Sequence, residues 1–340
     1  MKNIFDLNYA ELETYLLSIQ EKKYRAKQIF TWLYKKKAKT FAEMTDLSKD
    51  LIAKLEADFK IAYLEIVAKQ VSVDSTTKYV LLLDDKNTIE AVIMNYDWGK
   101  SICISSQVGC NMACSFCASG LNKCLRNLSS GEFIRQILTI EECEEKRITN
   151  VVIMGIGEPF NNYDNTIKAI FMMIDPKCLE IGQRKITVST SGIVNKIYDF
   201  ANENTQVNLA ISLHASNDEI RSKIMPINRK YPLDELINAC RYYIDKTNRR
   251  ITFEYILLDH VNDSEANANE LSNLIRGLNA YVNLISYNEV KEFDYKKSSF
   301  VRRDNFYKTL QRRGINVQYR KEKGADIFAA CGQLRRKVSL

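Results

Sequence analysis

Three cysteines stand close together in the segment Cys110-Asn-Met-Ala-Cys114-Ser-Phe-Cys117, which places three thiols within eight residues. A loop of this kind can wrap around one face of an iron–sulfur cluster, because each thiolate can bind a different iron. With only three protein ligands, the fourth iron of a four-iron cluster stays open to a substrate or a cofactor. The spacing therefore predicts a [4Fe–4S] centre held by Cys110, Cys114 and Cys117.

A structural zinc site is the alternative interpretation of these cysteines. Zinc commonly takes four protein ligands from two separated pairs. The sequence contains no second Cys-x-x-Cys, and its two histidines, His214 and His260, stand apart from each other and from the cysteines. A closed zinc site therefore has no evident fourth ligand. The rival hypothesis from another functional class is nevertheless a zinc-stabilised RNA-binding protein without catalysis.

Other reactive residue types occur singly, and each also has an ordinary structural interpretation. Gly157 and Glu158 follow an apolar run, where a glycine lets a ligand approach the backbone and a carboxylate can accept an ammonium group; an ordinary strand-to-helix turn would look the same. His214 is either a ligand contact or a hydrogen-bonded residue at a strand end. Cys331, taken alone, is a buried thiol. Cys103 faces the barrel mouth or belongs to the core.

The elements that must position these residues alternate between strand and helix from residue 101 onward. Runs of several apolar residues are typical of parallel strands covered on both faces, and helical stretches lie between them. This order predicts a partial (β/α)6 barrel, with its chemistry at the carboxyl ends of the strands. The expected strands are 102–105, 151–154, 185–189, 208–213, 252–257 and 282–285, with a late extension at 316–320, and the expected helices include 130–141, 163–174 and 232–245.

The chain before the barrel is expected to have two parts. Residues 1–62 show apolar side chains at helical spacing and form an N-terminal helical domain. Residues 63–98 change to short β runs at 78–83 and 89–94, which form a β-hairpin linker region that carries Glu90. Residues 99–340 then form the barrel and a C-terminal segment that carries Cys331.

Basic residues gather at both ends of the chain, whose formal net charge is +7. Residues 22–39 contain eight Lys or Arg, no acid and several aromatics, a mixture that suits RNA or a solvated helix above a core. The sequence has no apolar run long enough to span a membrane and no signal-peptide stretch, so a cytoplasmic protein is expected. In that compartment nine cysteines indicate metal or redox chemistry.

The cysteine triad after the first barrel strand resembles the radical S-adenosylmethionine superfamily, whose open iron binds that cofactor. Further segments resemble the RlmN-type adenine-C2 RNA methyltransferases, which are similar to the Cfr-type C8 methyltransferases. The matching segments are Tyr24-Arg-Ala-Lys-Gln-Ile-Phe, Cys103-Ile-Ser-Ser-Gln-Val-Gly-Cys110, Met154-Gly-Ile-Gly-Glu-Pro159, Ser189-Thr-Ser-Gly192, Ser212-Leu-His214, Met225-Pro-Ile-Asn228 and Ala329-Ala-Cys-Gly-Gln-Leu334.

This resemblance implies roles for single residues. Cys331 would carry a methyl group, Cys103 would resolve the intermediate by forming a disulfide bond with Cys331, and Glu90 would be the general base. Contacts with S-adenosylmethionine are implied for Gly157, Glu158, Ser189, Ser212, Leu213, His214 and Asn288.

The resemblance also implies the reaction: methylation of carbon 2 of adenine 2503 in 23S rRNA and of adenine 37 in tRNA. It implies two S-adenosylmethionine molecules per turnover, an electron donor such as flavodoxin or ferredoxin, and a monomer. C8 methylation of the same rRNA adenine, which gives antibiotic resistance, is the nearest alternative, and a radical enzyme for protein or small molecules is a further one. The sequence departs from the family at Glu289, Phe328 and the additional Cys124.

Overall fold

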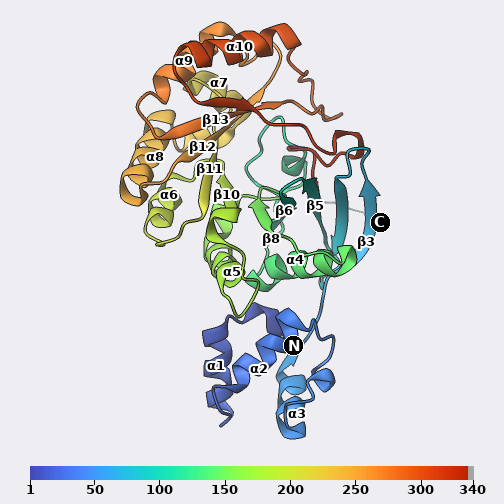
Figure 1. Ribbon diagram of the computed structural model, residues 1–340. Coiled ribbons are helices and arrows are strands. Elements are labelled where there is room, and N and C mark those ends of the chain that lie inside the picture. The colour runs from blue at the N-terminus through green and yellow to red at the C-terminus, as the bar shows by residue number, and fades with distance from the viewer. Residues whose placement is uncertain (336–340) are drawn as a thin grey trace.

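One mixed sheet organises the computed structural model, which describes residues 1–335. Its strand order is β14-β13-β12-β11-β10-β9-β6-β5-β4-β3 (Figure 1). The strands span β3 Glu65–Val71, β4 Thr77–Leu82, β5 Thr88–Tyr96, β6 Gly99–Ile104, β9 Asn150–Ile153, β10 Ile186–Thr190, β11 Asn208–Ser212, β12 Ile251–Leu257, β13 Ala280–Ser286 and β14 Val317–Tyr319.

The strands from β6 and β9 through β14 are parallel, and helices lie along the outside of the curved sheet (Figure 1). The expected six-strand barrel is confirmed, and β14 extends it at one edge. These strands are apolar because both of their faces are covered. The helices that connect them are α4 Ser130–Glu144, α5 Tyr163–Ile174, α6 Val194–Ala201, α7 Asp218–Ile224, α8 Leu233–Thr247, α9 Glu265–Leu274 and α10 Phe300–Arg312.

The segment expected to be a β-hairpin linker belongs to the main sheet. Strand β5 pairs antiparallel with the first barrel strand β6, with Val92 opposite Cys103. Strand β3, which the sequence pattern did not mark, pairs with β4 and completes a three-stranded extension. Nearly all residues of β4 and β5 are buried, so these strands are fixed beside the barrel rather than free to move between two domains.

Three helices form the N-terminal part, which lies at one end of the molecule next to α5 (Figure 1): α1 Tyr9–Ser18, α2 Arg25–Phe30 and α3 Lys49–Asp58. Asn8 and Ser48 cap the first and third helices by accepting backbone N–H groups. Leu12, Leu51 and other apolar residues of these helices are fully buried. None of the helices within residues 1–335 combines the length and the apolar composition that a membrane crossing needs.

Some residues of the basic stretch 22–39 pack in the core, and others face solvent. Phe30 and Tyr34 are core residues, whereas Tyr24 is exposed. Lysines at the end of the stretch pair with acids on the barrel: Lys35 with Glu180, Lys37 with Glu141 and Lys39 with Glu142. These three lysines therefore lie at the contact between the N-terminal part and the barrel. Exposed residues at the start of the stretch are Lys22, Lys23, Tyr24 and Lys27.

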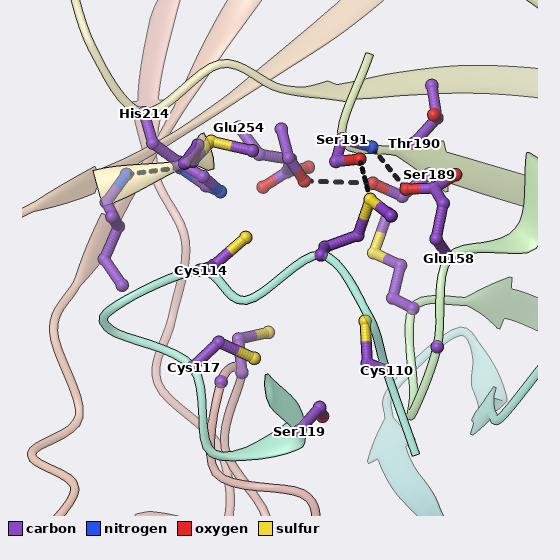
Figure 2. A pocket seen from close by; sticks show the side chains of 18 of the residues that line it. Cys110, Cys114, Cys117, Ser119, Glu158, Ser189, Thr190, Ser191, His214 and Glu254 are labelled. Atoms are coloured by element: carbon purple, nitrogen blue, oxygen red, sulfur yellow. Dashed lines mark hydrogen bonds between the residues drawn. The ribbon is translucent and has the colours of Figure 1, made fainter. Parts of the chain in front are cut away.

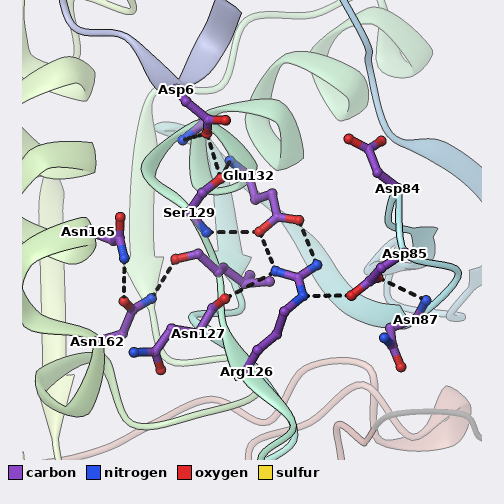
Figure 3. A network of polar contacts seen from close by, with 12 residues as sticks. Asp6, Asp84, Asp85, Asn87, Arg126, Asn127, Ser129, Glu132, Asn162 and Asn165 are labelled. Carbon is purple, nitrogen blue, oxygen red and sulfur yellow. Dashed lines mark hydrogen bonds and ion pairs between the residues drawn. The ribbon is translucent and has the colours of Figure 1, made fainter. Parts of the chain in front are cut away.

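A polar network fixes both the cysteine loop and the N-terminus to the start of α4 (Figure 3). Arg126 forms ion pairs with Asp85 at 2.6 Å and with Glu132 at 2.8 Å. Ser129 donates its hydroxyl to Asp6 at 2.6 Å. Because the short strands β7 (Gln107–Val108) and β8 (Arg126–Asn127) pair with each other, both ends of the intervening loop are held at one place.

Candidate active site

The loop after β7 brings Cys110, Cys114 and Cys117 onto the wall of one cavity of about 150 Å³ (Figure 2). We call it the cysteine-loop cavity. It lies at the carboxyl ends of the barrel strands, where parallel α/β folds carry their chemistry. Its wall also includes Met112, Phe116, Ser119, Met154, Gly155, Gly157, Glu158, Ser189, Ser191, Ser212, His214, Met225, Glu254, Arg320 and Cys331.

Local backbone geometry fixes the cysteine loop, and burial sets the protonation state of its three thiols. Gly109 has φ +86°, and a Cβ at this position would lie 2.3 Å from the carbonyl oxygen of Lys123, so the tight loop requires a glycine. Burial raises the pKa of Cys110 to about 12 and also raises the pKa of Cys114 and Cys117. Without a metal these thiols are therefore protonated, and metal binding must release their protons.

The opposite wall of the cavity is polar. Glu158 accepts the backbone N–H of Ser191 at 2.7 Å with one carboxylate oxygen and that of Phe160 at 3.0 Å with the other. These bonds hold the carboxylate in place and leave further acceptor sites on both oxygens. The hydroxyls of Ser189 and Ser212 lie 3.5 Å apart beside it. A carboxylate with two hydroxyls can bind the ammonium and carboxylate groups of an amino acid.

The two glycines near Glu158 are required by the packing of the protein itself, and the cofactor contact expected for Gly157 stays a prediction. A Cβ at Gly155 would lie 2.7 Å from the carbonyl oxygen of Ile104, and one at Gly157 would lie 2.6 Å from Cβ of Gln107. Both glycines line the cysteine-loop cavity. Their close neighbours are nevertheless the residues that follow β6, so the glycines let two adjacent strand ends pack together.

His214 is neutral and fixed in orientation. Its Nδ1 accepts the backbone N–H of Ile256 at 3.0 Å, which leaves the proton on Nε2. Burial, together with the positive charge of Arg221, lowers the pKa of His214 to about 3. The imidazole and the ring of Phe116 also form an edge-to-face contact, with ring centroids 5.0 Å apart. His214 therefore contributes a neutral hydrogen-bond donor to the site.

Two residues expected to contact the cofactor do not lie on this wall. Leu213 is fully buried in the main core because side chains alternate around the end of β11, which directs Ser212 and His214 into the cavity. Asn288 lies on a neighbouring cavity, and its amide is close to the carbonyl oxygen of Ser286, at 3.5 Å. The carbonyl oxygen of Leu213 accepts from Arg221, and Asn288 belongs to the neighbouring space.

That neighbouring space, of about 70 Å³, brings together Cys103 and Cys331, and we call it the thiol-pair cavity. Cys331 lines both cavities, whereas Cys103 lines only this one. Both thiols are free, so the disulfide expected from the family resemblance is not formed in this structure. Formation of that bond needs an oxidation step, and the structure shows the reduced pair.

Glu90, the candidate general base, is buried. It forms an ion pair with Lys78 at 3.6 Å and accepts the backbone N–H of Arg335 at 2.9 Å. Alternation along β5 places Glu90 on the same face as Val92 and Met94, which line the thiol-pair cavity. The C-terminal segment, residues 321–335, thus reaches the candidate base through Arg335.

The departures from the family pattern lie at the surface or outside the cavities. Glu289 is exposed and forms an ion pair with Lys296 at 3.2 Å. Phe328 is 49% exposed, in the turn before Cys331. The thiol of Cys124 is 3.5 Å from the carbonyl oxygen of Arg126 and lines neither cavity.

Arg320 is a site residue that sequence reasoning missed. It follows β14, lines both cavities, and lies 3.9 Å from a carboxylate oxygen of Glu254. Its positive charge lowers the pKa of Cys103, although burial and the charge of Cys331 raise it more, to about 12 overall. The only sequence signal was a basic residue at the end of an expected strand, which is uninformative without the tertiary contacts.

Arg221, also missed, holds the strand ends together from beneath the cavity. Its guanidinium is fully buried and donates to the carbonyl oxygens of Leu213 at 3.0 Å, Ser191 at 2.7 Å and Ser212 at 3.2 Å, and to Oδ1 of Asn228 at 2.9 Å. One side chain thereby joins the two segments that carry Ser189 and Ser212–His214 to the turn at Asn228.

Replacing Arg221 with methionine is expected to lower the free energy of unfolding by about 3 kcal/mol, because several buried carbonyls lose their donor. Lys223→Met is the matched control on the same helix. Its ion pair with Glu219 is exposed, so little change is expected. Urea unfolding of the metal-free proteins measures both, and equal midpoints for the two variants would contradict the role of Arg221.

Cys114→Ala is expected to reduce the iron content of anaerobically reconstituted protein from about four per chain to a small remainder, because one of three cluster ligands is lost. Cys124→Ala should keep the iron, since this thiol lines neither cavity. Iron and sulfide analysis with the visible absorption spectrum provides the measurement. Loss of iron in both variants would show that the cluster uses a different ligand set.

Comparison with known proteins decides the family. The profile of the ribosomal RNA large subunit methyltransferase N-terminal domain matches residues 2–61, and that of the radical SAM superfamily matches residues 104–271. A protein from Acholeplasma laidlawii, named probable dual-specificity RNA methyltransferase RlmN, is 51% identical over 98% of both chains. The chain belongs to the RlmN family.

Two further relatives are similar to this chain over nearly its full length. The protein of the same name from Caldanaerobacter subterraneus is 50% identical, over 99% of this chain and 98% of its own. A crystal structure of a radical SAM methyltransferase from Sphaerobacter thermophilus is 43% identical, with a TM-score of 0.93 and coverage of 98% and 99%. As an RlmN-family member the chain is a radical RNA methyltransferase that uses a [4Fe–4S] cluster and S-adenosylmethionine. The hypothesis of a non-catalytic zinc protein is therefore abandoned.

Proposed function

We propose that this enzyme methylates carbon 2 of adenine 2503 in 23S rRNA and of adenine 37 in tRNA. The observation that supports the proposal is the position of Cys331, which lines both the cysteine-loop cavity and the thiol-pair cavity. A methyl group on its sulfur would lie between the place where a radical is generated and the place where Cys103 can act. Relatives named dual-specificity RNA methyltransferase agree with two classes of RNA substrate.

The cysteine-loop cavity suits both cofactors. Cys110, Cys114 and Cys117 would hold the cluster, while Glu158 with Ser189, Ser212 and His214 would bind the amino-acid and adenosine parts of S-adenosylmethionine. When bound, these groups supply a carbon-centred radical by reductive cleavage of S-adenosylmethionine, and two molecules are used per turnover. We assign the electron to a donor such as flavodoxin or ferredoxin.

The chain's own residues perform the transfer to RNA. Carbon 2 of adenine lies between two ring nitrogens and is too electron-poor to attack a sulfonium methyl group directly. Cys331 first takes a methyl group on its sulfur. This methyl group then gives a hydrogen atom to the carbon-centred radical, and its carbon bonds to carbon 2. Glu90 accepts the proton from carbon 2, and the electron that the base gives up would return to the cluster held by Cys110, Cys114 and Cys117. A thioether then links Cys331 to the RNA.

Cys103 releases the product. Its thiolate attacks the sulfur of Cys331, a disulfide forms, and the bond between that sulfur and the methylene carbon breaks. The electron pair stays on the carbon, which takes a proton and becomes the methyl group of the RNA. An external dithiol then reduces the disulfide, which restores the pair of free thiols seen in the structure.

We assign RNA binding to residues 1–62, the N-terminal helical domain. Lys22, Lys23 and Lys27 face solvent beside the exposed ring of Tyr24, and such a surface can bind phosphates and stack on bases. The target adenine must leave its stack to reach the barrel mouth, so a loop adenine is favoured over a paired one. We further propose a monomeric, cytoplasmic enzyme, where the free thiols are maintained.

Anaerobic turnover with rRNA and tRNA fragments, followed by mass spectrometry of the nucleosides, tests the proposal. The expected product from both RNAs is 2-methyladenosine. Formation of 8-methyladenosine instead would favour the C8 alternative, and an absence of methylated adenosine in either RNA would overturn the proposal.

A further inference from the structure

An exposed aromatic pair borders the thiol-pair cavity. Trp98 is 61% exposed, and its ring stacks on that of Tyr96 with centroids 4.6 Å apart and an interplanar angle of 9°. Tyr96 in turn lines the thiol-pair cavity together with Cys103 and Cys331. The two rings therefore form a flat apolar step that begins at the cavity wall and ends in solvent.

The backbone does not explain a large aromatic at this position. Tyr96 ends β5 and is paired with Gly99 at the start of β6, so Asp97 and Trp98 form the turn between the two strands. Such turns favour Gly, Asn and Asp because of their backbone conformation. Single exposed apolar side chains are common on proteins, so exposure alone indicates nothing. The feature that requires an explanation is the parallel stacking of Trp98 on Tyr96, a residue of the cavity wall.

Basic residues lie beside the aromatic step on the side of the thiol-pair cavity. The ammonium group of Lys323 lies 5.4 Å from the ring centroid of Tyr96 and donates to the carbonyl oxygen of Asn95 at 3.4 Å. Arg320 and Lys321 line the thiol-pair cavity, and the acid that follows them, Glu322, forms an ion pair with Lys297 at 2.6 Å. Aromatic rings with adjacent cations suit a single-stranded nucleic acid, whose bases stack while its phosphates meet the cations.

We infer that the Tyr96–Trp98 pair is a stacking surface for the nucleobase next to the target adenine, with Lys323 placed to meet the adjoining phosphate. This inference rests on the proposed function. When the target base is turned out of its stack, its neighbour in the strand loses a stacking partner. The exposed face of Trp98, separated from the cavity wall by a single ring, can replace that partner.

The test uses the full-length, cluster-loaded enzyme and an RNA stem–loop that carries 2-aminopurine beside the target adenine. Trp98→Ala is expected to weaken RNA binding about tenfold, because stacking of one base on an aromatic side chain contributes about 1–3 kcal/mol. The fluorescence quenching of 2-aminopurine on binding should also be lost. Trp98→Phe, which keeps an aromatic face, should restore most of the affinity and the quenching.

Tyr242→Ala is the matched control, because Tyr242 is an exposed aromatic that contacts another ring, Tyr198, but lies on α8. It should bind RNA like the unmodified enzyme. Wild-type affinity and quenching in Trp98→Ala would overturn the inference while leaving the proposed function intact. Reduced activity only with a protein electron donor would overturn it in favour of a donor-docking surface. If the unmodified enzyme binds RNA but does not methylate it, the proposed function fails, and the binding comparison still tests the stacking surface.

Discussion

Cys331→Ala is expected to abolish methylation of RNA, by on the order of 10³-fold or more, while the iron–sulfur cluster remains. Cys331 lines both cavities, and none of the three cluster-ligand candidates can substitute for it without giving up its metal. The turn that carries Cys331 is held through its backbone. Ala118 donates its N–H to the carbonyl oxygen of Gly332 at 2.7 Å, and Ser119 donates its hydroxyl to that of Leu334 at 2.7 Å.

Those two bonds do not involve the thiol, so removal of the sulfur should leave the turn in place. Methylated nucleoside is measured after anaerobic turnover, and iron content and absorption are measured on the same preparation. Cys143→Ala, which removes an exposed cysteine, is the control and should remain active. Methylation by Cys331→Ala at the rate of the unmodified enzyme would show that the methyl group does not pass through this residue.

Cys103→Ala is expected to stop the reaction after RNA has become attached to the protein. The attacking group must be a thiolate, yet burial and the charge of Cys331 raise the pKa of Cys103 to about 12. Arg320, whose charge lowers the pKa of Cys103, lies on the same cavity wall and favours the thiolate needed for the attack.

Gel electrophoresis under denaturing conditions separates protein–RNA adduct from free RNA, and mass spectrometry of the digested adduct locates the attachment. Nearly all reacted RNA should remain bound to Cys103→Ala, whereas the Cys143→Ala control should release it. Recovery of free methylated RNA from Cys103→Ala at the normal rate would assign product release to a different group.

Several features could be predicted from the sequence because they depend only on short segments of the chain. The order of strands and helices follows from apolar runs and helical periodicity, which are local patterns. The expected helix 163–174 coincides with α5, and the expected late strand 316–320 contains β14. The loop from Cys110 to Cys117 needs no long-range information, because three thiols within eight residues must lie near one another.

Sequence patterns were least informative where a residue's environment depends on the tertiary structure. The side chain of Leu213 lies in the core, whereas its neighbours Ser212 and His214 line the cavity, because alternation separates adjacent side chains. Lys35 in the basic stretch pairs with Glu180 of the barrel, a partner 145 positions away. The sequence gives the type of such a residue, whereas its contacts depend on which distant segments pack against it.

By itself, the sequence determined the barrel, the cysteine loop and the family resemblance, since local periodicity and spacing encode them. Only the tertiary structure decided that Arg320 extends from β14 to the wall shared by both cavities, and that Glu90 is buried against Arg335, 245 positions away. The physical reason is that burial, charge pairing and pKa depend on which surfaces meet in the folded chain, and those surfaces come from segments far apart in the sequence.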